Sequence, residues 1–145
     1  IGENTIPDQC VVQIGLRFNT SRQKEELLMA LEKSAASCTV PDTWAEVDAS
    51  RLMDCMDTTP GVEALFHHLK RTAQDCGYGP IGSFQVGGLS DSGLTVAVGI
   101  PTVCGMGVKG EGNHTPNERA EVASLYSRCV LAACAAATLE DSFAG

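Results

Sequence analysis

Three glycine-rich segments carry the residues that could do chemistry. The first two read Gly87-Gly88-Leu89-Ser90-Asp91 and Gly99-Ile100-Pro101-Thr102, and the third, Gly110-Glu111-Gly112-Asn113-His114, ends on a histidine. Glycine lets backbone approach a ligand closely, and imidazole binds metals and oxyanions near neutral pH, so His114 is a candidate metal or oxyanion partner at the rim of a cleft. One histidine does not make a metal site, so further ligands would have to come from elsewhere. The alternative is a loop histidine that hydrogen-bonds backbone.

A second candidate is Arg51, at a predicted hinge between two lobes. A planar guanidinium can hold a substrate carboxylate through two parallel hydrogen bonds, although a surface arginine is an equally open interpretation. The nearby carboxylates are interpreted as turn residues rather than a catalytic pair, which leaves general acid-base chemistry without a site. These carboxylates are Asp42, Asp48, Asp54 and Asp57.

The segment Gly105-Met106-Gly107-Val108-Lys109-Gly110 matches the G-x-G-x-x-G pattern of dinucleotide-binding loops. That pattern binds a nucleotide only where a helix begins inside it. Here Asn113-His114-Thr115-Pro116 interrupts the place where the helix would run, so nucleotide binding is not expected.

The elements that must position these residues begin with a predicted β-α-β unit over 10–49. Apolar residues alternate with polar ones over 10–18, which indicates a strand with one buried face. Thr20, with Gln23 three residues on, forms a capping box for a helix that reaches about Cys38. A short strand over 44–49 returns beside the first.

The rest of the chain is predicted to hold two more helices among short strands. Thr59 and Pro60 open a helix that Gly77 closes, and on it His67 and His68 are interpreted as structural, one flanking the buried stripe and one facing water. The last helix begins at Thr115 or, as we favour, at Ser124. Further elements are strands over 83–86 and 100–104 and a helix or strand over 94–98. The fold class is α/β or α+β, in two lobes with a hinge over 49–54.

Composition restricts the class of protein. The 145 residues carry a net charge of −8 with a sequence pI near 4.7, so no nucleic-acid partner is expected, and no apolar run is long enough to span a bilayer. Seven cysteines without a Cys-x-x-Cys pair argue against a disulfide framework and for a reducing, cytoplasmic location. The opening Ile1-Gly2-Glu3 reads like the middle of a longer protein.

These segments together resemble one family. Asn4-Thr5-Ile6-Pro7, the strand ending at Phe18, Arg51, the three glycine-rich segments and Glu118 are similar in order and spacing to the co-catalytic zinc peptidases and amidohydrolases that include carboxypeptidase G, succinyl-diaminopimelate desuccinylase and aminoacylase-1. The likeness runs from Asn4 to about Leu139. It covers only the carboxy-terminal part of such an enzyme, with 1–50 as the second half of the lid and dimerisation domain and 51–145 as the end of the catalytic domain.

The resemblance implies roles for four residues of this chain. His114 would be a ligand of one of two zinc ions, and Arg51 would hold the free carboxylate of the substrate. Asn4 would contact substrate from the lid, and Leu89 falls where the family often has a glycine against the substrate, which would narrow the pocket. Cys104 replaces an acidic residue common in the family, with no role that follows.

The resemblance also implies what this chain lacks. The other zinc ligands, the bridging aspartate and the general-base glutamate belong to the amino-terminal part of the family's enzymes, so no catalytic residue is assigned here. The whole enzyme would use two zinc ions to activate water and polarise an amide bond in a small peptide or N-acyl amino acid. An alternative function is a non-catalytic folded module that mediates homodimerisation, through a sheet edge such as 10–18.

Overall fold

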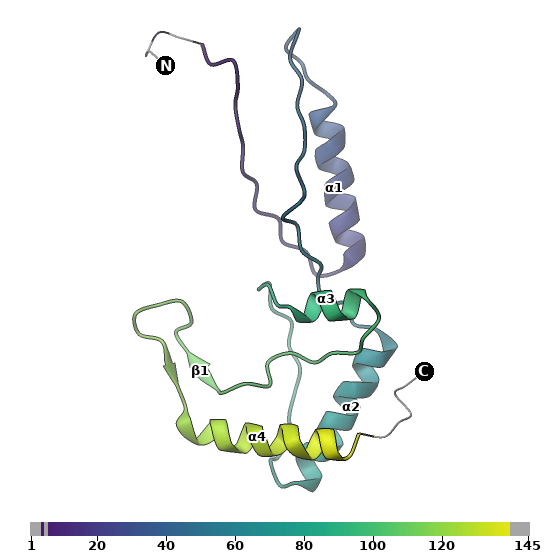
Figure 1. The fold of residues 1–145 in the computed structure, drawn as a ribbon, viewed down its shortest axis with the longest axis vertical. Coiled ribbons are helices and arrows are strands. Elements are labelled where there is room, and N and C mark those ends of the chain that lie inside the picture. The colour runs from purple at the N-terminus through teal and green to yellow at the C-terminus, as the bar shows by residue number, and fades with distance from the viewer. Residues whose placement is uncertain (1–3, 5, 140–145) are drawn as a thin grey trace.

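The computed structural model describes residue 4 and residues 6–139. In chain order it contains α1 (Ser21–Ala35), α2 (Pro60–Asp75), α3 (Ser92–Ala97), β1 (Gly110–Glu111), β2 (Arg119–Ala120) and α4 (Val122–Ala137) (Figure 1). β1 and β2 form a two-stranded antiparallel sheet in which Glu111 pairs with Arg119. At this coarse level the described chain is α+β. None of its described helices has the length and apolar character needed to cross a membrane.

The predicted caps of the first two helices are confirmed. The Thr20 hydroxyl accepts a hydrogen bond from the Gln23 amide at 3.2 Å, which satisfies a free donor at the start of α1, and the Gln23 side chain accepts one from the amide of Asn19, the residue before the cap, at 2.8 Å. The Thr59 hydroxyl caps α2 through the Val62 amide at 3.2 Å, with Pro60 at the first helical position. α1 ends at Ala35, three residues before the predicted Cys38.

The end of α2 is also as predicted. Gly77 follows α2 with a φ of 72°, in the left-handed region where only glycine carries no Cβ penalty. Its conformation turns the chain so that the amides of Tyr78 and Gly79 both donate to the Ala73 carbonyl, at 2.8 and 3.1 Å. Of the two histidines on α2, His68 is buried and its Nε2 donates to the Ala135 carbonyl of α4 at 2.9 Å, while His67 is exposed. This confirms the predicted placement of one histidine beside the buried stripe and the other toward water.

The core forms where α2 packs against α4, which lies across one end of α2 in Figure 1. Leu69, Ala73 and Leu131 are buried at its centre. Half-buried side chains from the following loops complete it, namely Cys76, Tyr78, Ile81, Val103, Met106 and Ala135. This core holds the loops that lead into α4 and the β1–β2 hairpin.

The predicted strands differ most from the structure. Segments 10–18 and 44–49 are extended along the length of α1 in Figure 1, but they form no strand pairing in the described chain. The predicted β-α-β unit is therefore wrong in its two strands, and only its helix is confirmed. Segments 83–86 and 100–104 are likewise unpaired. The physical reason is that alternation specifies one apolar face, whereas a strand needs a partner backbone, and Val11 and Val12 stay 85% and 72% exposed.

Two remaining boundaries follow from local hydrogen bonds. Segment 94–98, left open between helix and strand, lies largely in α3. α4 begins at Val122, two residues before the favoured Ser124, and the alternative start at Thr115 is wrong because the Thr115 hydroxyl donates to the Gly112 carbonyl at 2.7 Å and closes a turn there. As expected, no helix begins in the glycine-rich loop 105–110, which leads into β1.

The surface is too large for a closed domain. The chain exposes 11644 Å², whereas a folded monomer of 15.2 kDa exposes roughly 7,100 Å², an excess of about 4,500 Å². Much of the excess is apolar, because large side chains on the extended segments face outward, including Val12, Ile14, Trp44, Phe84 and Val86. Monomeric soluble proteins rarely expose apolar surface of this extent.

Candidate functional site

His114 lies at the tip of the loop that joins β1 to β2. The loop is closed by local hydrogen bonds, because the Thr115 amide donates to the Gly112 carbonyl at 3.1 Å and the Glu118 amide donates to the Thr115 carbonyl at 3.1 Å. An ion pair between Glu111 and Arg119, 2.7 Å long, joins the two strands below it. His114 is exposed, so its imidazole is presented to solvent on a short, locally fixed hairpin.

Backbone conformation in this loop is unusual at two positions. Gly112 has a φ of 74°, and a Cβ there would also stand 3.1 Å from the Asn117 carbonyl oxygen, so the position requires glycine. His114 itself has a φ of 64°, in the left-handed region that costs a non-glycine residue on the order of 1 kcal/mol. Histidine therefore stands where the backbone alone would favour glycine or asparagine.

Arg51 is presented by a tight turn. The Asp48 carboxylate accepts a hydrogen bond from the Ser50 amide at 2.9 Å, and the Leu52 amide donates to the Ala49 carbonyl at 2.9 Å. Hydrogen bonds from Ser50, by its hydroxyl and then its amide, hold the pKa of Asp48 below its usual value. The Arg51 side chain is exposed and makes no ion pair within the described chain, so its guanidinium is free to bind an external carboxylate.

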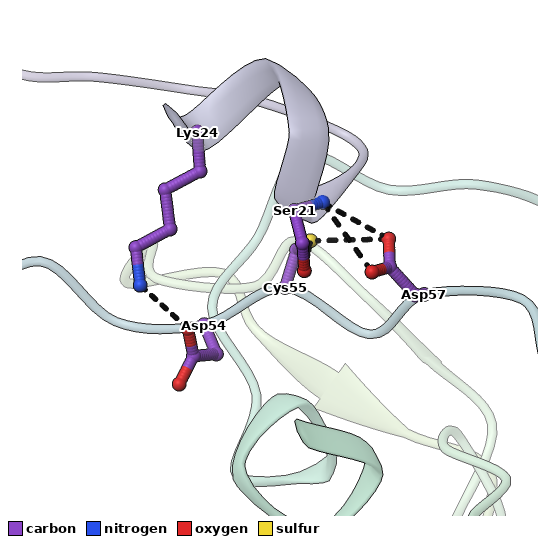
Figure 2. A network of polar contacts seen from close by, with 5 residues as sticks. All are labelled: Ser21, Lys24, Asp54, Cys55 and Asp57. Atoms are coloured by element: carbon purple, nitrogen blue, oxygen red, sulfur yellow. Dashed lines mark hydrogen bonds and ion pairs between the residues drawn. The ribbon is translucent and has the colours of Figure 1, made fainter. Parts of the chain in front are cut away.

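The segment after Arg51 is tied to the start of α1 by the polar network in Figure 2. Lys24 forms an ion pair with Asp54 at 2.5 Å, and both side chains are partly buried. The Asp57 carboxylate accepts from the Ser21 amide at 3.1 Å, which satisfies a free donor at the helix start and places negative charge there. These contacts, with the Cys55 thiol beside Ser21 and Asp57, join α1 to the predicted hinge.

Two pKa values in this network move in opposite directions. Hydrogen bonding to Ser21, by its hydroxyl first and then its amide, lowers the pKa of Asp57, with a further contribution from the Cys55 thiol. Burial raises the pKa of Cys55, and the charge of Asp57 adds to that shift. The network therefore favours a charged carboxylate beside a neutral thiol, which is a structural arrangement rather than a nucleophile with its base.

The first glycine-rich segment contacts two other parts of the chain. The Arg17 guanidinium donates to the Gly87 carbonyl, which joins segment 10–18 to this loop. The Ser90 hydroxyl lies 3.0 Å from the Ser92 hydroxyl and 3.1 Å from the Cys104 sulfur. Hydrogen bonds from Ser90 and then Ser92 lower the pKa of Cys104, which is exposed.

Arg51, Leu89 and His114, three of the four residues assigned to a site from the sequence, border one wide groove that passes most segments of the chain from Pro7 to Leu131, so bordering it does not place them side by side. Its volume is about 3620 Å³, more than three times that of a usual small-molecule pocket of roughly 300–1,000 Å³. No hydrogen bond or ion pair joins these three residues anywhere in the described chain. Leu89 is 72% exposed. Asn4, the fourth, does not line the groove and is exposed.

The metal ligands present do not form a complete site. Within residue 4 and residues 6–139, no group of three or more His, Cys, Asp or Glu side chains is placed to hold a metal ion. Glu118, four residues after His114, lines the same groove but makes no hydrogen bond to His114. The exposed imidazole fits one ligand position and no more.

Sequence reasoning missed the contacts that connect distant segments. The Lys24–Asp54 pair, the Ser21–Asp57 hydrogen bonds and the Ser90–Cys104 contact all join residues that lie 14 or more positions apart. No local pattern marks these residues as partners, since charge spacing is informative only within one helix or one strand pair.

Comparison with known proteins adds no assignment. Searches against protein-family models, curated proteins and solved structures found no match.

Proposed function

We propose that this chain is part of a metal-dependent hydrolase that cleaves an amide bond in a small peptide or N-acyl amino acid bearing a free carboxylate. The observation that carries the proposal is His114, an exposed imidazole on a locally fixed hairpin whose left-handed backbone favours a different residue. Sparsely populated backbone conformations cluster at functional sites, so we take the imidazole of His114 as the functional group of this loop. The resemblance to the co-catalytic zinc hydrolases supplies that chemistry.

In this proposal each candidate has a separate role. His114 is one ligand of a two-zinc centre, and the zinc ions supply Lewis-acid activation of water and of the amide carbonyl. Arg51, exposed and without an ion pair in the described chain, binds the substrate carboxylate. Leu89 narrows the substrate pocket, and Asn4 contacts the substrate from the lid.

The chain alone is proposed to be inactive, with the remaining ligands and the general base in an amino-terminal part of the enzyme. Two observations support this. Within the described residues, no group of metal ligands surrounds the accessible imidazole of His114. The groove that contains His114 is much larger than a small substrate needs. The chain also exposes about 4,500 Å² more surface than a closed domain of its mass. A second polypeptide would fill the groove and cover the excess surface.

The test is reconstitution. Zinc bound to the purified 145-residue chain is measured by atomic absorption, alone and after an amino-terminal companion segment is added, with hydrolysis of dipeptides and N-acyl amino acids as the second readout. We expect zinc and activity only in the mixture. The proposal is wrong if the mixture folds as a complex and still neither holds zinc nor hydrolyses any of these substrates.

A matched pair of variants assigns the ligand. His114→Asn keeps a residue that tolerates the left-handed backbone, so it removes the imidazole without straining the loop. His67→Asn removes an exposed imidazole on α2. We expect His114→Asn to lose zinc from the reconstituted complex and His67→Asn to retain it. Equal zinc content in the two variants would remove His114 from the centre.

A second candidate function is a non-catalytic module that pairs with another copy of itself. It is favoured by the unpaired, apolar segment 10–18, where Val11, Val12 and Ile14 are exposed and the backbone is free to pair. Sedimentation distinguishes the two candidates. A chain that is a stable dimer by itself, and remains zinc-free with the companion, supports the module and contradicts the hydrolase.

A further inference from the structure

Tyr78, directly after α2, has two cations against its ring. The Lys109 ammonium nitrogen lies 5.8 Å from the ring centroid, and the central carbon of the Arg128 guanidinium lies 5.6 Å from it. Both distances are within cation–π range. Neither cation forms an ion pair with any described residue, although the chain carries 18 acidic residues against 10 basic ones. Two unpaired cations at one ring leave a local excess of positive charge in an acidic protein.

The same cluster holds two buried polar atoms without hydrogen-bond partners. They are the Tyr78 hydroxyl oxygen and the Arg128 Nε. Buried polar groups are nearly always satisfied in native proteins, so each of these two atoms calls for a partner. Both residues line the groove described above, and so does Lys109, although the two unpartnered atoms themselves are buried.

The Arg128 side chain is already fixed on one side. Its Nη1 donates to the Gly105 carbonyl at 3.0 Å. The opposite side of the guanidinium, where the N–H groups of Nε and Nη2 point the same way, has no partner in the described chain. Two parallel N–H donors of this kind match the two oxygens of a carboxylate or a phosphate.

We propose that Tyr78, Lys109 and Arg128 form a binding site for an oxyanion, a carboxylate or a phosphate group. Arg128 holds two of its oxygens through Nε and Nη2, the Tyr78 hydroxyl donates a third hydrogen bond, and Lys109 supplies a second positive charge. The site lies on α4 and the loops before it, and it uses none of the residues assigned to amide hydrolysis. It therefore goes beyond the proposed function and needs neither zinc nor a companion segment.

The test is isothermal titration of the 145-residue chain with two probes, sodium phosphate and sodium acetate, at constant ionic strength. We expect saturable binding of at least one probe, and the tighter of the two identifies the source of the oxyanion. Absence of saturable heat with both probes overturns the proposal. This titration does not depend on hydrolase activity. Absence of anion binding would therefore not contradict the proposed hydrolase, and absence of hydrolase activity would not contradict the anion site.

Variants locate the binding. Tyr78→Phe keeps the ring and its packing but removes the buried hydroxyl, and Arg128→Lys keeps the charge but removes Nε and its planar pair of donors. Each is expected to weaken binding by about tenfold or more, as the loss of a charge-assisted hydrogen bond implies. Lys33→Gln is the control, because it removes an exposed cation near the end of α1. If Lys33→Gln weakens binding as much as the two site variants, the binding is diffuse charge attraction and the proposal is wrong. Unchanged binding in both site variants overturns it as well.

Discussion

Gly93 in α3 packs directly against the backbone of segment 54–55, so one added methyl group should disturb this contact. It is buried, and a Cβ built on it would lie 2.3 Å from the Asp54 carbonyl oxygen and 3.0 Å from the carbonyl carbon. Side-chain carbons do not approach a backbone oxygen that closely. Gly93→Ala must therefore push α3 away from segment 54–55 by about 1 Å, the distance that restores van der Waals contact.

Two opposing effects set the size of the loss. Alanine in place of glycine stabilises a helix by up to about 1 kcal/mol. Overpacking a buried site costs roughly 1–3 kcal/mol, and the upper part of that range applies because the obstacle is backbone rather than a flexible side chain. The net expectation is a loss of about 1–2 kcal/mol in the free energy of unfolding, or roughly 3–7 °C in Tm for a chain of 145 residues. Asp54 also pairs with Lys24, so the displacement reaches α1.

The assay is urea unfolding followed by far-ultraviolet circular dichroism, with Gly88→Ala as the control. Gly88 lies five residues before Gly93, in the glycine-rich segment that precedes α3, but a Cβ there meets nothing within 4 Å. Gly88→Ala is expected to change stability by less than about 0.5 kcal/mol, or to raise it slightly by restricting the unfolded chain. If Gly93→Ala is as stable as Gly88→Ala, the close packing of α3 on the hinge is refuted.

Three further outcomes follow from the charged and polar groups. In the reconstituted hydrolase, Arg51→Ala should raise KM for carboxylate-bearing substrates by about tenfold or more in steady-state kinetics, and equal activity of the unmutated enzyme toward amide-capped and free-acid substrates would contradict this role. Because hydrogen bonds to Ser21 lower the pKa of Asp57, its contribution to stability is present above its ordinary pKa of 3.8 and is lost as pH falls toward the lower folded value. Urea titrations below pH 4 should show this loss in the unmutated chain and a smaller one in Asp57→Asn. Iodoacetamide should alkylate Cys104 at a lower pH than Cys55, because hydrogen bonds lower the pKa of the Cys104 thiol and burial raises the pKa of the Cys55 thiol. Peptide mass spectrometry measures the order of alkylation, and the reverse order would contradict this prediction.

The helices could be predicted from the sequence because their signals are local. A threonine hydroxyl three residues before the amide that it caps, as at Thr20 and Thr59, is visible in the sequence alone, and so is the glycine that ends α2. The Thr115 cap failed for an equally local reason. Its hydroxyl has a nearer acceptor in the Gly112 carbonyl, so it closes a turn instead of opening a helix.

The strands could not be predicted in the same way. Alternation along 10–18 describes a face that could be buried, but strand formation depends on backbone from another segment, and the described chain supplies none. For the site, the sequence identified Arg51 and His114 by residue type and by the glycines around them. It could not show the contacts of Lys24 with Asp54 or of Arg128 with Gly105, because these depend on how distant segments pack.

Because the backbone of His114 is left-handed, selection for folding and selection for catalysis should favour different residues at this position. A library randomised at this codon and sorted only for folded protein should drift to glycine or asparagine, which occupy a φ of 64° with less strain. The same library sorted for catalysis in the assembled hydrolase should return histidine. Deep sequencing of both pools would compare the residue frequencies at position 114, and so separate the requirement for an imidazole from the preference of the backbone.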